Sequence, residues 1–319
     1  MTMVKKLFLI GTIFAMACSA LAEEAKGLSY SLKVDAAYYL ETDYQKGKDH
    51  FAKPTGPYDG ILARATWEAT YTLPTPLGQG ELLSGANVEF KGAIEASPLT
   101  IRPIVKVVFT PFPFLVFEAG SSIGTGWNAL GFEGFCKYKN GDYKDITPFA
   151  QYYHDHWVNA TLQFDTGEIF EGDWNHVVMM ATYEIIYQGI TGLNKGQLWA
   201  WQNIEGNING LGYDFYAILG YKMPLFVDLI GFMADFYGQY SSKDYGELAS
   251  TYGNFMTIDL CALAELAFNK NNSLLVGARV SSRRSFSTPH KKGKEEPYLV
   301  KSGREWFFDG FIFSWEHKF

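Results

Sequence analysis

The chain has 319 residues, of which 17% are aromatic and only 19% charged. Its 34 acidic and 27 basic residues give a net charge of −7, which argues against nucleic-acid binding because phosphate neutralisation needs a basic face. Past the first 22 residues, no apolar run approaches the roughly 20 residues that a membrane-spanning helix needs, and this argues against a helical membrane protein.

The first 22 residues have the three parts of a secretory signal peptide. Lys5 and Lys6 give a positive start, and residues 7–17 form an apolar stretch. Residues 20–22 (Ala-Leu-Ala) then place small side chains before a cleavage site at Glu23. The apolar stretch is too short to span a membrane as a helix. We therefore expect a secreted protein from which this segment is removed.

Cleavage leaves one mature domain over residues 23–319 and removes residues 1–22 with two lysines and no acid, so the net charge moves from −7 to −9. An alternative is lipidation at Cys18, although the usual large aliphatic residue three positions earlier is missing. Cys136 and Cys261 remain after cleavage, and an oxidising compartment would permit a disulfide between them. Two unpaired cysteines, one in a loop and one in a strand, are the favoured prediction.

Apolar and polar residues alternate with a period of two over unusually long runs of the mature chain. In the first run Tyr30, Leu32 and Val34 alternate with Lys33 and Asp35. A strand in a soluble protein averages about 5–6 residues, whereas a tilted strand that spans a bilayer needs roughly 9–11. The pattern predicts about twelve strands, over residues 29–40, 61–73, 86–95, 99–110, 114–125, 158–165, 177–188, 213–222, 226–240, 256–266, 274–283 and 304–319.

Two of these segments, 114–125 and 226–240, alternate less regularly than the others. In the second, Asp228 and Asp235 fall on opposite faces of a regular strand, which indicates either a β-bulge or a misassigned register.

The connections between the predicted strands alternate in length. Short ones are expected over residues 74–81, 110–113, 171–175, 223–225 and 269–272. Longer ones are expected over residues 41–59, 127–155, 190–212, 241–253 and 286–303, and one short connection, 96–98, interrupts this alternation. An even number of strands with short periplasmic turns and long extracellular loops is typical of outer-membrane barrels. The sequence thus predicts an all-β fold, a single transmembrane antiparallel β-barrel of about twelve strands; the rival is a secreted soluble β-sandwich or β-helix.

The last strand ends in aromatic residues that alternate back from the terminus, namely Phe311, Phe313, Trp315 and Phe319. This ending resembles the assembly signal of Gram-negative-type outer-membrane β-barrel proteins as a class, although His317 stands where such sequences more often carry an apolar residue. The resemblance implies insertion by the barrel assembly machinery into the cell outer membrane, in contact with outer-membrane lipid and lipopolysaccharide.

Charged side chains recur on one face of the predicted strands. They are costly against lipid, so we expect them to line a wet lumen or to pair across it. The predicted pore-lining residues are Lys33, Asp35, Arg64, Glu68, Glu89, Lys91, Arg102, Lys106, Glu184, Asp214, Asp259 and Arg279. The same face holds Lys222, Arg283, Glu95, Glu118 and Glu265.

The inward charges favour a narrow, porin-like passive channel for small hydrophilic solutes, with selectivity set by opposed charges and by inward-folding loops such as 127–155. The alternative is a non-conducting surface barrel, closed by salt bridges, whose loops serve adhesion or structural binding. A basic run over residues 290–294 could hold lipopolysaccharide phosphates or be a solvated loop. Trp199 and Trp201 could stack on a sugar ring, but a pair that anchors a loop at the membrane interface is favoured.

No enzymatic activity is predicted. Lipid hydrolysis at a barrel rim would need a Ser beside a His on one strand and a polar residue that orients the His. His154 and His156 have no Ser two residues away, so the sequence provides no catalytic residue of this kind. The two histidines share one side of a strand, but no third ligand for a metal is identifiable by spacing. No metal and no cofactor are expected.

Overall fold

The computed structural model describes residues 27–75, 77, 83, 85–248, 255–287 and 300–319. The predicted signal peptide and the basic run 290–294 lie outside the described residues. Among the described residues, no helix has the length and apolar character needed to cross a membrane. The short 3-10 turns η1 (Thr166–Glu168) and η2 (Ser242–Leu248) lie between strands.

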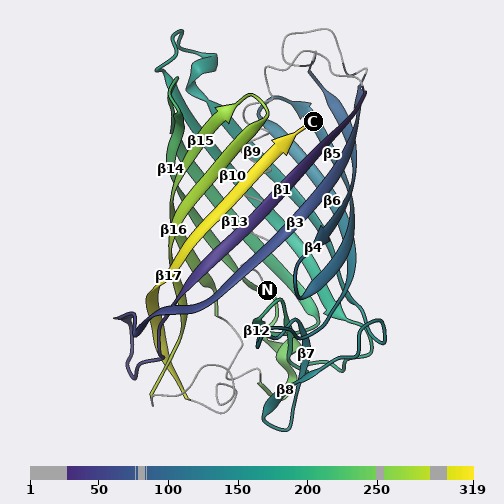
Figure 1. The fold of residues 1–319 in the computed structure, drawn as a ribbon, viewed down its shortest axis with the longest axis vertical. Helices are drawn as coiled ribbons and strands as arrows, with labels where there is room; N and C mark the ends of the chain where they lie inside the picture. Colours follow the sequence, from purple (N-terminus) through teal and green to yellow (C-terminus); the bar gives the residue numbers. More distant parts are fainter. Residues whose placement is uncertain (1–26, 76, 78–82, 84, 249–254, 288–299) are drawn as a thin grey trace.

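Twelve long strands form one closed antiparallel barrel (Figure 1). Each strand pairs with the next along the chain, and β1 pairs with β17 to close the ring, with Val34 opposite Trp315. The barrel strands are β1 (Gly27–Glu41), β3 (Gly56–Pro74), β4 (Asn87–Ala96), β5 (Thr100–Phe112), β6 (Leu115–Gly126), β9 (Tyr153–Asp165), β10 (His176–Ile190), β13 (Gly210–Lys222), β14 (Val227–Gln239), β15 (Thr257–Asn269), β16 (Asn272–Phe286) and β17 (Lys301–Lys318). The predicted fold class and strand number are confirmed.

The polarity of the wall is the reverse of that of a soluble protein. On β5, Val105 is 63% exposed and points outward, whereas its neighbour Lys106 is 6% exposed and points inward. On β9, Leu162 is 59% exposed and Thr161 only 8%. Because side chains alternate across a strand, this contrast places a band of apolar side chains around the outside, as in an outer-membrane barrel.

The irregular segment predicted over residues 226–240 is β14, and it contains a register shift. Its pairing with β15 slips between Val227 and Leu229, which confirms the predicted bulge. The bulge changes the facing of the strand there, so Asp235 beyond it is buried inward while Asp228 lies at the strand end. The other weak segment, 114–125, is β6 and pairs on both sides.

The two ends of the barrel differ in their connections, as the sequence predicts. At the turn end, where the chain also ends, β5 and β6 are joined by residues 113–114, and β15 and β16 by residues 270–271. At the loop end, the connections are longer, except that only residues 97–99 join β4 to β5.

Five short strands at the loop end were not predicted. β2 (His50–Ala52) pairs in parallel with β17. A separate sheet in the order β12-β11-β7-β8 is formed by two loops far apart in sequence (Figure 1). Its strands are β7 (Phe135–Lys139), β8 (Asp142–Asp145), β11 (Trp199–Trp201) and β12 (Ile204–Asn207). We call this sheet the cap; its strands, of three to five residues, are too short to give a clear alternation in sequence.

Candidate functional site: the lumen and its cap

A chain of buried ion pairs crosses neighbouring barrel strands near the loop end. Its three cations and three anions sum to zero net charge, and all face inward. We call this set the ionic belt, consisting of Lys33, Asp35, Arg64, Glu95, Arg102 and Asp155.

Glu95 lies at the centre of the ionic belt. Its Oε2 is 3.2 Å from Nη1 of Arg64 and 2.8 Å from Nη2 of Arg102. Arg64 Nε donates to Oδ2 of Asp35 at 3.2 Å, and Arg102 Nη1 donates to Oδ2 of Asp155 at 3.3 Å. Glu95 and Asp155 are both 0% exposed. Such pairs offset the cost of burying charge only because each ion meets several partners.

The tip of the cap reaches into the barrel mouth and joins the ionic belt. Nε2 of Gln202 donates to Glu95 Oε1 at 3.2 Å and to the Thr100 hydroxyl at 2.6 Å. Gln202 and Asn203 have φ angles of 52° and 61°, as the two-residue type I′ turns of tight hairpins require. The β11–β12 turn therefore covers the lumen. The loop 127–155, predicted to fold inward, contributes its partner strands β7 and β8.

Both tryptophans singled out from the sequence are buried in the cap, so neither the sugar-stacking nor the interface-anchor prediction is correct. Trp199 is 1% and Trp201 6% exposed. Trp201 stacks on Tyr153 of β9 at 4.4 Å between ring centroids and meets Phe135 edge-on at 5.6 Å. These rings form an apolar core between cap and barrel. Sequence alone could not place them there, because the packing joins segments about 50–65 residues apart.

The two cysteines described are free thiols, as the sequence favours. Cys136 lies in β7 of the cap, where burial raises the pKa of its thiol to about 12. Cys261 lies on β15 and faces the lumen among apolar side chains.

A second group of charges, the turn-end cluster, lies on β3 to β6, closer to the turn end than the ionic belt. Lys106 Nζ is 3.1 Å from Glu68 and 3.9 Å from Glu118. Lys91 Nζ is 2.9 Å from Glu89 and 3.8 Å from Glu68. The Glu89 side chain is 24% exposed, so this cluster is partly hydrated, unlike the ionic belt.

The inward face across the barrel from these charges carries apolar side chains beside its buried charged ones. An apolar cluster runs from β10 through β17 to β1. Its buried members are Ala37, Met180, Tyr216, Ile218, Leu229, Met233, Cys261, Leu263, Leu275 and Ile312. Where both the inward and the outward residues of a strand are apolar, the sequence shows no alternation of polarity. The alternation therefore could not identify these inward apolar residues.

The remaining predicted lining residues also face inward. Glu184 lies directly opposite Asp214 across β10 and β13. Asp259 lies opposite Asp235 across β14 and β15, and all four carboxylates are buried. Arg279 pairs with Asp309, Nε to Oδ2 at 2.7 Å.

Four buried inward acids were missed: Asp155, Asp235, Glu305 and Asp309. Asp155 was assigned to a loop that proves to be strand. The other three lie at or beyond register shifts, which reverse the parity used to assign faces.

The structure also brings together a Ser and a His that are distant in sequence. Ser121 of β6 lies opposite His156 of β9, with Oγ 2.9 Å from Nδ1, on the outward face near the loop end. The sequence criterion considered one strand only and so could not find a pair across two strands. The His154 and His156 rings lie 5.4 Å apart, and among the described residues no group of three His, Cys, Asp or Glu side chains is placed to hold a metal ion.

The aromatic residues of the C-terminal strand face outward. Phe311 and Phe313 are 43% and 40% exposed on β17. Trp315 is half-buried, and Phe319 is 69% exposed at the turn end. The backbone N–H of Phe319 donates to the carbonyl of Tyr30, so the terminus itself continues the closing seam between β17 and β1.

No family model matches the chain, and no curated protein matches it. Among solved structures it is similar to the β-domain of the Bordetella autotransporter BrkA, with 8% identity and a TM-score of 0.47 over 91% of this chain and 99% of that one. It is similar to the COG4313 outer-membrane channel of Pseudomonas putida F1, with 7% identity and a TM-score of 0.46 over 94% and 100%. The translocator domain of the autotransporter NalP from Neisseria meningitidis has 11% identity and a TM-score of 0.38 over 98% and 95%.

Proposed function

We propose that this protein resides in a Gram-negative-type outer membrane as a barrel without a continuous aqueous pore, and that it presents its cap outside the cell for structural or adhesive contact. Burial of the inward side chains supports this most directly: Arg64 is 4%, Thr182 0%, Met233 5% and Asp259 1% exposed. Side chains that line a water-filled channel would keep contact with water. Barrels of about 8 strands are filled by side chains and those of 16–18 strands are open, and this twelve-stranded barrel follows the first pattern.

Conductance across a planar bilayer tests the proposal. Two refolded proteins are compared, residues 23–319 and a variant in which residues 199–207 are replaced by a short Gly-Ser turn. Neither should give stepwise openings, because the ionic belt and the apolar cluster fill the lumen beneath the cap. Reproducible openings of the unchanged protein would refute a closed barrel. Openings confined to the variant would instead make the cap a gate over an open pore.

The second candidate is the narrow passive channel for small hydrophilic solutes. It is favoured by the distribution of charge around the ring: inward cations on β1, β3, β4 and β5 are paired with acids on the same side, while Glu184, Asp214 and Asp259 add acids on strands across from them. An uneven distribution of this kind can set ion selectivity. If openings occur, the reversal potential in a salt gradient should show a preference for cations, given the net charge of the chain.

We further propose that the protein is not a lipid hydrolase. The Ser121–His156 pair is the feature that favours such an activity. However, among the described residues no carboxylate or amide is hydrogen-bonded to the His156 ring, and Ser121 lies within the β5–β6–β9 ladder, where backbone N–H groups are already engaged. Release of fatty acid from mixed micelles should equal that of a Ser121→Ala variant. Release that depends on Ser121 would contradict the proposal.

A further inference from the structure

One part of the barrel wall has no strand beside it. β3 pairs with β4 only as far as Ala65, which lies opposite Ala96. Beyond that point β3 continues to Gly56, paired on its other edge with β1. The cause is the short connection between β4 and β5. It ends the β4–β5 hairpin closer to the turn end than the β1–β3 hairpin beside it. We call the region beside residues 56–64 of β3 the notch.

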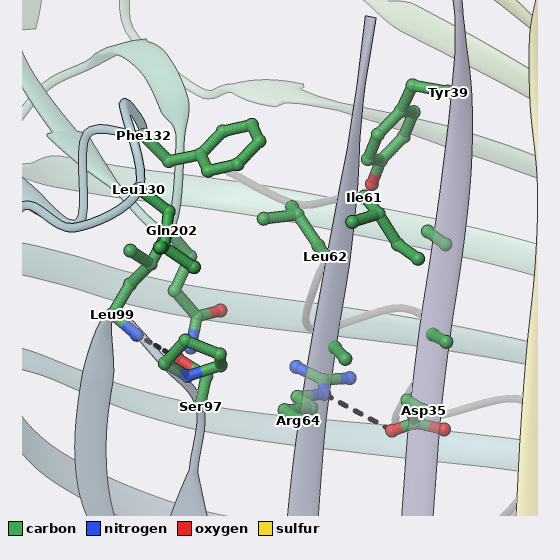
Figure 2. Close-up of a pocket in the computed structure, with 14 residues that line it drawn as sticks. Asp35, Tyr39, Ile61, Leu62, Arg64, Ser97, Leu99, Leu130, Phe132 and Gln202 are labelled. Carbon is green, nitrogen blue, oxygen red and sulfur yellow. Dashed lines mark hydrogen bonds and ion pairs between the residues drawn. The ribbon is translucent and has the colours of Figure 1, made fainter. Parts of the chain in front are cut away.

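A pocket of about 140 Å³ occupies the notch (Figure 2). Its lining includes Leu62 and Arg64, which face the lumen, and also Ile61 and Ala63, which face outward. Because alternate residues of a strand lie on opposite sides of the wall, one pocket can touch both sets only where the wall is open. The pocket therefore lies within the wall, between the outward side chains and the buried Asp35–Arg64 ion pair.

A strained turn lies at the edge of this opening. Leu130 has a φ of 55°, followed by Gly131 at 83°, and the turn is closed by the Phe132 N–H donating to the Ala129 carbonyl at 2.9 Å. A leucine is strained in this left-handed region, which residues other than glycine seldom adopt. Yet the Leu130 side chain is 82% exposed, so packing within the chain does not offset the strain. Leu130 and Phe132 both line the pocket from across the gap in Figure 2.

The opening lies next to the membrane rather than in the external water. Tyr38 and Tyr58 face outward together at the loop end, with ring centroids 5.7 Å apart, and the Tyr38 hydroxyl donates to the Pro57 carbonyl. Tyrosines at this position mark the boundary between membrane and water. Ile61 is three residues farther toward the turn end, about 10 Å along the strand, and is 51% exposed within the apolar band.

We propose that the notch takes up the hydrocarbon end of an acyl chain from an outer-leaflet lipid. The outward half of its lining is continuous with the lipid-facing surface, so acyl chains are the apolar groups that always have access to it. Its volume is close to the ~150 Å³ of an apolar cavity that holds one benzene-sized molecule, which suits a short hydrocarbon segment and excludes a whole lipid. The inference goes beyond the proposed scaffold function and does not depend on whether the lumen conducts.

Photo-crosslinking tests this inference. The full mature protein is reconstituted in phosphatidylcholine vesicles whose lipid carries a diazirine at the terminal carbon of one acyl chain. After irradiation, labelled residues are mapped by mass spectrometry. A chain end that stays in the bilayer labels outward residues near mid-membrane, whereas an inserted one labels Leu62 or the buried Leu99. We expect label at these two positions, and its absence would overturn the proposal.

Two variants sharpen the test. Ala63→Phe places a ring in the outward half of the pocket and should reduce label at Leu62 and Leu99 to background. Ala69→Phe is the matched control, because Ala69 shares the strand and face but lies opposite Gly92 of β4, away from the notch. Leu130→Gly, which relieves the turn and widens the mouth, should increase the label. Heat-modifiable mobility on gels checks that both variants are folded. Equal labelling of Leu62 and Leu99 in folded Ala63→Phe and folded Ala69→Phe would also overturn the proposal.

Discussion

Glu95 is the residue on which the loop half of the lumen most depends. It accepts hydrogen bonds from Arg102 and from Gln202 of the cap, forms an ion pair with Arg64, and is fully buried. The belt around it is electroneutral, so loss of this single carboxylate leaves one positive charge uncompensated in a buried site. The cost of such a loss exceeds the net contribution of the pair itself.

We therefore expect Glu95→Gln to lower the free energy of unfolding by about 3–5 kcal/mol. The measurement is urea unfolding of the refolded barrel, followed by the mobility change on unheated gels. Glu89→Gln is the control: Glu89 pairs with Lys91, its side chain is 24% exposed, and its loss should cost no more than ~1 kcal/mol. Equal effects of the two substitutions would show that the ionic belt does not stabilise the barrel.

At the scale of elements, the cap is a small sheet made by two loops that are docked on the barrel by aromatic rings. Its strands are too short to be stable alone, since isolated short hairpins are marginal in water. Trp199 is the largest fully buried side chain of the structure, it packs edge-on against Tyr153 of β9, and its Nε1 donates to Asn209. The cap should thus depend on the barrel, while the barrel should not depend on the cap.

Trp199→Ala removes a fully buried ring, a change that costs about 3–5 kcal/mol in a packed core. We expect the cap to open and become sensitive to added protease, while the barrel keeps its heat-modifiable mobility. Trp174→Ala, at an exposed position of the turn between β9 and β10, should leave protease sensitivity unchanged. Loss of barrel folding in Trp199→Ala would mean that cap and barrel form one cooperative unit.

At the scale of the whole molecule, closure of the ring places every long strand between two neighbours, although the edge of β3 beyond Ala65 stays unpaired at the notch. The seam between β1 and β17 completes that closure, and the chain ends on it. Phe319 adds little to packing there, because its ring is 69% exposed. Its proposed role is recognition by the barrel assembly machinery.

Phe319→Ala should accordingly reduce the amount of folded barrel recovered from the outer membrane of expressing cells. Refolding of the same variant from urea into detergent should match that of the unchanged protein, since no buried contact is lost. Phe268→Ala is the control: Phe268 is also an exposed phenylalanine at the turn end, with 51% of its surface exposed, and its loss should affect neither measurement. A refolding defect in Phe319→Ala would assign the residue to stability instead.

The sequence by itself determined the barrel. Alternation such as that of Val105 and Lys106 depends on strand geometry alone, and a lipid-facing band imposes it on every strand in turn. The inward positions of Arg64, Glu95 and Arg102 followed from the same parity. Parity failed beside register shifts, so Asp235 and Asp309 were found only in the structure.

Only the tertiary structure decided what the inward side chains contact, how the loops form the cap and where β3 lacks a neighbouring strand. Burial of Trp199 depends on contacts between segments distant in sequence, which no local pattern records. The partners of Glu95 are fixed by strand stagger, as is the unpaired edge of β3 beyond Ala65. The local rule of alternation sets which way a side chain points, while stagger and packing between strands set what it meets there.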